Sequence, residues 1–183
     1  MRLIFVITIF LTTCFTTTYA QGDFFTVGLE GQQYPTGYLP GIRAELGLSD
    51  HISLSFRLGA NIFDHENFGV QFMETGSGSG ASVGLRYYFS HDYDKFFIGV
   101  RSDFWRNRVD WQDFDINDQI IEGTSNIIVV QPTVIGGYVF QLGDHFRITP
   151  TLAGGFEWNV QTEGEPTGEG AILLWGLNLE YRI

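Results

Sequence analysis

Eleven charged residues recur at alternate positions of the chain, and their types favour ion pairing over catalysis. The set holds six arginines and five acids but no lysine: Glu30, Arg43, Glu45, Arg57, Arg86, Arg101, Asp103, Arg147, Glu157, Glu180 and Arg182. A guanidinium group is planar, weakly hydrated and able to bind a carboxylate through two hydrogen bonds, which suits it to buried ion pairs. The only lysine, Lys95, lies in a predicted turn. The pattern therefore predicts an enclosed network of ion pairs.

A second group of acids lies between residues 110 and 122 and could bind a metal ion. Asp113, Asp115 and Asn117 match the first three ligand positions of a calcium-binding loop. However, Asp118 stands where such a loop has glycine, and Thr124 stands where it has a bidentate glutamate. We therefore expect a solvated acidic loop without metal or other cofactor, and the calcium site remains the alternative.

One group of side chains could imitate a lipid-modifying catalytic site. His65 follows Asp64 directly, and Ser77 lies in the same predicted loop. A nucleophile and its base need only meet in space, so this spacing does not by itself support catalysis. We expect no enzymatic activity. The other histidines each lie at a predicted short turn and lack the spacing of metal ligands: His51, His91 and His145.

The segment Gly76–Gly80 alternates glycine with serine but does not predict a phosphate-binding loop. Such loops lead into a helix, whose first amides complete the anion site. Here a strand pattern follows instead. We expect a flexible loop.

Apolar residues alternate with small or polar ones through eight segments, which predicts that the charged set is carried by an all-β barrel. In residues 175–183 the aromatic and aliphatic side chains share one parity, and Gly176, Asn178, Glu180 and Arg182 share the other. Alternate side chains of a strand point to opposite faces of its sheet. The predicted strands are 24–31, 41–49, 52–62, 80–89, 96–106, 126–141, 146–160 and 169–183.

The predicted connections alternate between short and long. Short turns are expected at 49–51, 90–95 and 142–145, and long polar loops at 31–40, 63–79, 107–125 and 161–168. In an antiparallel up-and-down barrel of eight strands this order places the short turns and both termini at one end, as in outer-membrane barrels. A turn centred on Asp50 would bring Glu45 opposite or diagonal to Arg57.

The apolar face is predicted to face lipid and the charged face to fill the lumen. An eight-stranded barrel has an interior just wide enough for side chains, so its many large apolar residues would overfill it. Aromatic residues bracket the aliphatic ones, as at the two interfaces of a membrane. They are Phe25, Tyr87, Phe89, Phe96, Tyr138, Phe140, Phe146 and Tyr181 near the short turns, and Phe63, Phe104, Phe156 and Trp158 near the long loops.

The predicted strand 126–141 departs from the alternation. Residues 127–130 are apolar on both parities, and Pro132 removes a backbone donor where a closed barrel has no free edge. We expect a bulge there, or a strand that projects above the membrane.

Residues 1–20 are predicted to be a cleaved signal peptide, and residues 21–183 form the barrel domain. Arg2 precedes an apolar run, and small residues end at Ala20. Leu11–Cys14 offers a lipoprotein cleavage site as an alternative. Cys14 is the only cysteine, so no disulfide is expected in the exported chain. The formal net charge of −11 argues against a nucleic-acid partner.

On these residues the chain resembles the small eight-stranded outer-membrane barrels, the class of the OmpA transmembrane domain and OmpX. Its terminal segment is similar to the signal by which such barrels are recognised for assembly, with Gly176, Leu179 and Tyr181 at matching positions and Ile183 in place of the usual phenylalanine. The resemblance implies an outer-membrane location in a Gram-negative cell envelope. It also implies contact with outer-membrane lipid and the barrel-assembly machinery, and a monomer.

Three functions are compatible with the sequence. The first is an outer-membrane barrel with a plugged polar lumen, which has a structural or surface-interaction role and reaches an extracellular ligand through its long loops. The second is a secreted soluble barrel that, like the lipocalins, binds a hydrophobic ligand inside. The third is an outer-membrane lipid-modifying enzyme. We expect the first.

Overall fold

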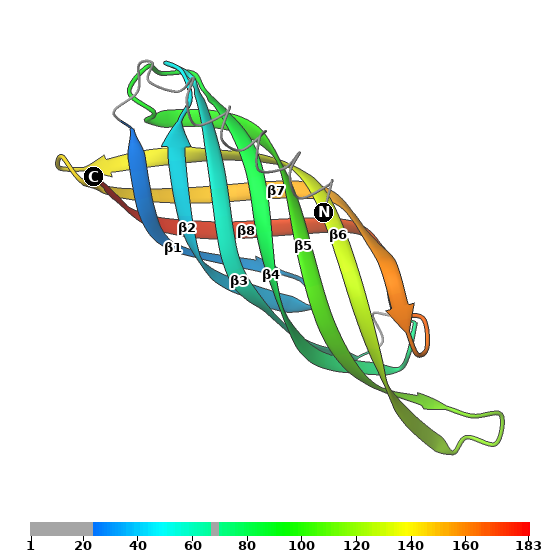
Figure 1. Ribbon diagram of the computed structural model, residues 1–183. Helices are drawn as coiled ribbons and strands as arrows, with labels where there is room; N and C mark the ends of the chain where they lie inside the picture. Colours follow the sequence, from blue (N-terminus) through cyan, green and yellow to red (C-terminus); the bar gives the residue numbers. More distant parts are fainter. Residues whose placement is uncertain (1–23, 67–69) are drawn as a thin grey trace, which may run out of the picture.

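The computed structural model describes residues 24–66 and 70–183, which form a closed antiparallel β-barrel (Figure 1). Each strand pairs with its neighbours in sequence, and β1 pairs with β8 to close the ring. The strands are β1 (Phe25–Tyr34), β2 (Gly37–Gly47), β3 (Ile52–Glu66), β4 (Met73–Tyr88), β5 (Lys95–Phe114), β6 (Ile120–Leu142), β7 (Phe146–Glu163) and β8 (Gly170–Arg182). The predicted up-and-down barrel of eight strands is confirmed, and the predicted signal peptide lies outside the described residues.

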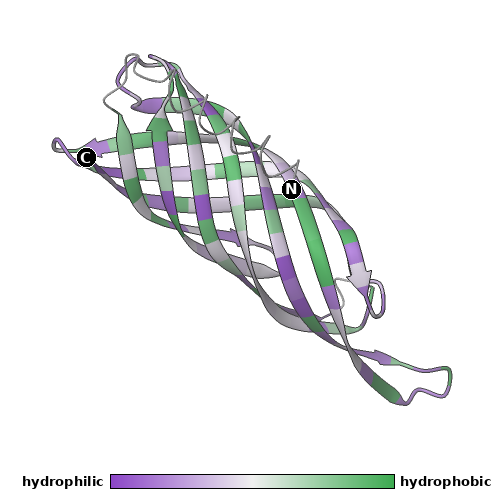
Figure 2. Ribbon diagram, viewed as in Figure 1, coloured by the Kyte–Doolittle hydropathy of each residue, from purple (hydrophilic) through white to green (hydrophobic). Residues whose placement is uncertain are grey.

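The apolar face of the sheet is on the outside of the barrel. Hydrophobic and hydrophilic bands alternate along the strands (Figure 2), and large aliphatic side chains face outward: Leu58 is 61% exposed, Leu29 60% and Val100 57%. Contiguous apolar surface of this kind is costly in water and marks a surface that meets lipid or another apolar partner. Within the described residues, no helix is long and apolar enough to cross a membrane.

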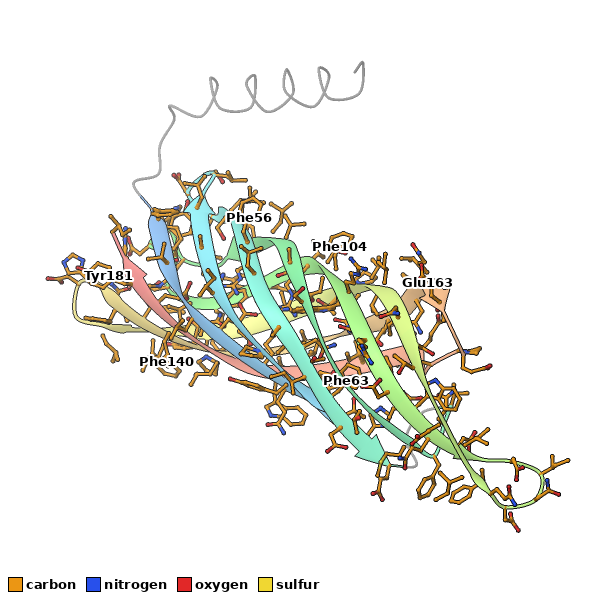
Figure 3. All side chains as sticks on the ribbon, turned by 60° about the horizontal axis from the view of Figure 1, so that its bottom comes forward. Phe56, Phe63, Phe104, Phe140, Glu163 and Tyr181 are labelled. Atoms are coloured by element: carbon orange, nitrogen blue, oxygen red, sulfur yellow. The ribbon has the colours of Figure 1, made fainter. Side chains whose placement is uncertain are left out.

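Aromatic side chains border the aliphatic surface, with one correction to the prediction. Toward the end with the three short turns, Phe140 and Tyr181 are 51% and 41% exposed (Figure 3), and toward the other end Phe104 and Trp158 are 47% and 51% exposed. Phe63, however, is buried. It lies two residues from Asn61 on the inward parity of β3, so its ring fills the lumen and does not meet lipid.

The connections place three turns at one end of the barrel and four at the other, but the predicted long loops are mostly strand. Only two residues connect β1 to β2, and five connect β5 to β6. The expected loop 107–125 is instead a paired hairpin that runs to Phe114 opposite Ile120. Polar residues on both faces concealed these strand extensions, because a strand without an apolar face lacks the alternation by which strands are predicted.

The segment Gly76–Gly80 is also strand, contrary to the flexible loop expected from its composition. It lies inside β4 and pairs with both β3 and β5. A Cβ atom on Gly76 would come within 2.5 Å of the Phe63 ring, and one on Gly80 within 2.3 Å of the Trp105 ring. The inward glycines leave the space that these large side chains occupy in the narrow lumen.

The pairing of β6 with β7 is irregular near the apolar segment 127–130, where a bulge was predicted, but the extra residue belongs to β7. Ile128 pairs with Gln161 but Val129 pairs with Asn159, so Val160 of β7 is an extra, bulged residue. Beyond Gln112 of β5 and Asn126 of β6, the two strands pair only with each other among the described residues. This distal hairpin, residues 113–125, projects past the rest of the barrel (Figure 1).

Candidate functional site: a buried charge network and a cavity above it

The end of the lumen near the short turns is organised around the carboxylate of Glu45. It accepts hydrogen bonds from Arg43 at 2.8 Å and Arg86 at 2.9 Å, and from the hydroxyls of Ser53 and Tyr88 at 2.5 Å each. These partners come from β2, β3 and β4, so a single carboxylate joins three strands. Glu45 itself is fully buried.

A second centre lies in the middle of the lumen, where two arginines share three acceptors. Arg57 donates to Glu30 at 2.9 Å, to Asp103 at 2.6 Å and to Gln32 at 2.7 Å. Arg101 donates to the same three side chains at 3.0, 2.9 and 2.8 Å. Arginines and acceptors from β1, β3 and β5 are thereby held across the barrel.

Arg43 connects the two centres electrostatically. Its Nε lies 3.7 Å from Glu30 and 3.6 Å from Glu180, while its Nη2 binds Glu45. Glu180 also accepts hydrogen bonds from Thr26 at 3.1 Å and Thr149 at 3.3 Å. The charged side chains of six strands and the hydroxyls of Thr26 in β1 and Thr149 in β7 thus form one continuous network.

Three residues of the predicted charge set lie at the edges of this network. The Arg147 guanidinium donates to the backbone oxygen of Tyr93 and lies 4.7 Å from the centre of the Phe24 ring. The Arg182 guanidinium lies over the same Phe24 ring, 5.4 Å from its centre. Glu157 lies near the loop end, where it accepts a hydrogen bond from Gln131.

The expected pairing of Glu45 with Arg57 does not form. The turn is centred on Asp50 as predicted, since Glu45 pairs with Ser55 in the ladder, and Arg57 is diagonal to it. Arg43 lies directly opposite Arg57. Glu45 pairs with Arg43 and Arg86, and Arg57 pairs with Glu30 and Asp103 instead. Strand register determines which residues are adjacent in the sheet, but a long side chain such as that of Arg57 can form ion pairs with residues across the barrel.

Neutral polar side chains complete the network, and sequence reasoning missed them. Gln32, Ser53 and Tyr88 are buried and bind the charged groups directly. Trp105 is only 1% exposed and donates from Nε1 to Gln131 at 2.9 Å, while Arg57 lies 5.2 Å from its ring centre. All four lie at the same alternate positions as the charged residues of their strands, and this position in the sequence could have identified them as lumen residues.

Above Trp105, toward the loop end, the lumen opens into a cavity of about 250 Å³. Its polar wall includes Tyr34, Asn61, Asn107, Glu74, Glu157 and Glu169. The apolar wall includes Phe63, Val109, Ile127 and Ile172. Half of these ten positions lie in predicted loops, so the sequence did not bring the ten side chains together.

The acidic residues of the distal hairpin serve its turn. The Asp115 carboxylate accepts hydrogen bonds from the backbone amides of Asn117 at 2.7 Å and Gln119 at 2.8 Å, and Asp113 accepts one from Phe114. The amides of Gln119 and Asn117 hold the pKa of Asp115 below its ordinary value. Among the described residues, no three side chains of histidine, cysteine or acid are grouped as metal ligands.

The three side chains considered for lipid chemistry point in different directions. His65 faces inward, where its Nε2 lies 3.4 Å from Glu74. Asp64 and Ser77 are exposed on the outer face. A serine nucleophile and its base must lie within hydrogen-bond reach, so these residues do not form a catalytic triad.

The terminal segment divides between the two faces of β8. Leu179, Tyr181 and Ile183 face outward and are 47%, 41% and 69% exposed. Gly176 faces inward, where a Cβ atom would come within 2.7 Å of Gln32. The outward residues therefore extend the exposed apolar surface, and the glycine makes room for a neighbour inside the lumen.

Solved structures with the same architecture are found, although no protein-family model and no curated sequence matches the chain. The N-terminal β-barrel domain of Pseudomonas aeruginosa OprF is 15% identical, with a TM-score of 0.51, and the match covers 88% of this chain and 98% of that one. Neisserial surface protein A is 10% identical, with a TM-score of 0.51 and coverage of 88% and 97%. Both are small outer-membrane barrels of eight strands. At these identities the likeness concerns the fold.

Replacing Arg57 with alanine should destabilise the folded barrel by about 3 to 5 kcal/mol, because the buried carboxylates of Glu30 and Asp103 would lose one of the two arginines that they share, and their charge would no longer be fully neutralised. The measurement is the urea midpoint of the full chain in detergent micelles. Arg108→Ala is the control, since that side chain is 67% exposed and pairs only with exposed Asp110. Its midpoint should barely change. Equal midpoints for the two variants would contradict a stabilising role for the network.

Proposed function

Because the chain has the fold of the small eight-stranded outer-membrane barrels, we propose that it is a non-enzymatic outer-membrane scaffold with a closed polar lumen. Its role is structural and interactive: the barrel anchors the distal hairpin, residues 113–125, and the neighbouring loops at the cell surface. The buried charge network carries this proposal, because it fills the bore with paired side chains. The exposed aliphatic surface agrees with the outer-membrane location.

The size of the space left inside the network supports a closed lumen. Between Glu30, Arg43, Arg57, Arg86 and Arg101 the free volume is about 10 Å³. A single water needs roughly 10 to 15 Å³ measured in this way, so no continuous water column fits there. Trp105 and Gln131 form the next layer toward the loops.

The shape and composition of the distal hairpin support a surface-interaction role. Its two strands extend beyond the pairing of their neighbours, so they form an arm that projects from the barrel. Ile116 is fully exposed and Ile120 is 66% exposed, close to the acids Asp113 and Asp118. Exposed aliphatic side chains with a charged surround are typical of surfaces that contact a partner.

The charged lumen and apolar exterior do not favour a soluble barrel that holds a hydrophobic ligand. Such a barrel needs the opposite orientation, with apolar side chains lining the interior. The separation of His65 from Ser77 likewise gives no support to lipid-modifying catalysis. We propose that the protein is a monomer whose partners are outer-membrane lipid, the barrel-assembly machinery during insertion, and an extracellular ligand of the loops.

The closed lumen should give very low conductance when the full-length protein is reconstituted in planar bilayers. The Arg57 and Arg101 guanidinium groups and their acceptors occupy the narrowest part of the bore, so ions have no hydrated path. Single-channel recording in salt solution makes the measurement. A steady conductance of porin size would refute the closed lumen.

The distal hairpin should be accessible from outside the cell. A short epitope inserted between Asn117 and Asp118 should bind antibody on intact cells, since both residues lie at the tip of the hairpin. The matched control is the same epitope between Gly143 and Asp144, in a turn at the opposite end of the barrel, which should bind antibody only after the outer membrane is permeabilised. The reverse labelling pattern would overturn the proposed orientation.

A further inference from the structure

The cavity at the loop end of the lumen differs in charge from the network beneath it. Three carboxylates line the cavity, those of Glu74, Glu157 and Glu169, and no lysine or arginine of residues 24–66 and 70–183 does. The arginines lie deeper, where their own acids neutralise them. The only basic group at the wall is His65, which already pairs with Glu74 at 3.4 Å. The cavity is therefore strongly electronegative.

The side-chain amide of Asn107 is a second observation, because its buried oxygen lacks a hydrogen-bond donor among the described residues. Asn107 is only 4% exposed and lines the cavity, yet its Oδ1 accepts no hydrogen bond from any described residue. A buried acceptor without a partner costs free energy, which a ligand that donates a hydrogen bond would recover. The same oxygen lies beside Gly78 of β4, where a Cβ atom would come within 2.0 Å of it.

The remaining wall limits the chemistry of such a donor. The apolar side chains Phe63, Val109, Ile127 and Ile172 come from β3, β5, β6 and β8, on either side of the acids of β4 and β7, and the volume of about 250 Å³ suits a molecule of a few heavy atoms. A metal ion would need several ligands converging on one point, whereas no such group of three occurs among the described side chains. An anion would meet only acidic groups.

We propose that this cavity binds a small aliphatic ammonium ion. The ammonium group donates hydrogen bonds to the side-chain oxygens of Glu74, Glu157 and Asn107. The hydrocarbon chain of the ligand lies against the apolar side chains of the cavity. Trp105 closes the floor beneath it, through its hydrogen bond to Gln131, whose amide in turn donates to Glu157. The site is separate from the distal hairpin, so loss of either one leaves the other intact.

Isothermal titration of the full-length barrel in detergent with 1,5-diaminopentane tests the site. The diamine should bind at one site per barrel, and 1,5-pentanediol, which has the same chain without charge, should give no heat. Glu157→Gln should raise the dissociation constant of the diamine about tenfold. The matched control is Glu163→Gln, the same change at an exposed position of the same strand outside the cavity, which should bind as the parent does.

Two further variants keep the test decisive if Glu157→Gln fails to fold, as judged by heat-modifiable migration in gels. Asn107→Leu removes the unpartnered acceptor, and Glu169→Gln changes an exposed loop carboxylate; each should weaken diamine binding. If Glu163→Gln weakened diamine binding as much as Glu157→Gln does, general charge attraction would explain the binding, and the proposal would be overturned. Binding of pentanediol as tight as that of the diamine, or displacement of the diamine by equimolar calcium chloride, would overturn it as well.

Discussion

Each charged side chain inside the barrel has lost its water, so it must find a partner on another strand. An unpaired ion in such an interior costs several kcal/mol, while a paired and hydrogen-bonded one is tolerated. Arg57 meets this requirement by reaching both β1 and β5, and Glu45 by receiving donors from three strands. The same pairings that neutralise the charges therefore tie the wall of the barrel together across its bore.

The proposed contact of the outer face with lipid imposes the complementary constraint. A strand in a bilayer must pair all its backbone groups with neighbours, which a closed ring achieves without an edge. Where the outer face of a strand carries aliphatic side chains, its polar side chains must face the lumen. The space inside the lumen then limits their size. The glycines of β4 answer that limit by admitting Phe63 and Trp105 into the lumen. Above Trp105 the acids are no longer balanced by arginine, and the cavity results.

The alternation of residue types was sufficient to predict the fold, the strand number and the face that each charged residue occupies. It could not predict partners, since Arg57 bypasses its diagonal neighbour Glu45 for side chains distant in sequence. Nor could it predict the strand extensions of β5 and β6, because polar residues occupy both faces there and the alternation is lost. The Gly76–Gly80 strand was missed for a related reason: glycine has low strand propensity, and its value here lies in the space it leaves.

The most direct test of the account is fluorescence quenching by brominated acyl chains, which reports contact between tryptophan and lipid. Two variants retain one tryptophan each, Trp175 on the outer face of β8 or Trp105 in the lumen, with the other tryptophans replaced by phenylalanine. In brominated phosphatidylcholine vesicles, Trp175 should be quenched strongly and Trp105 weakly. Equal quenching of both, or stronger quenching of Trp105, would contradict an apolar face turned to lipid and a charged face turned inward.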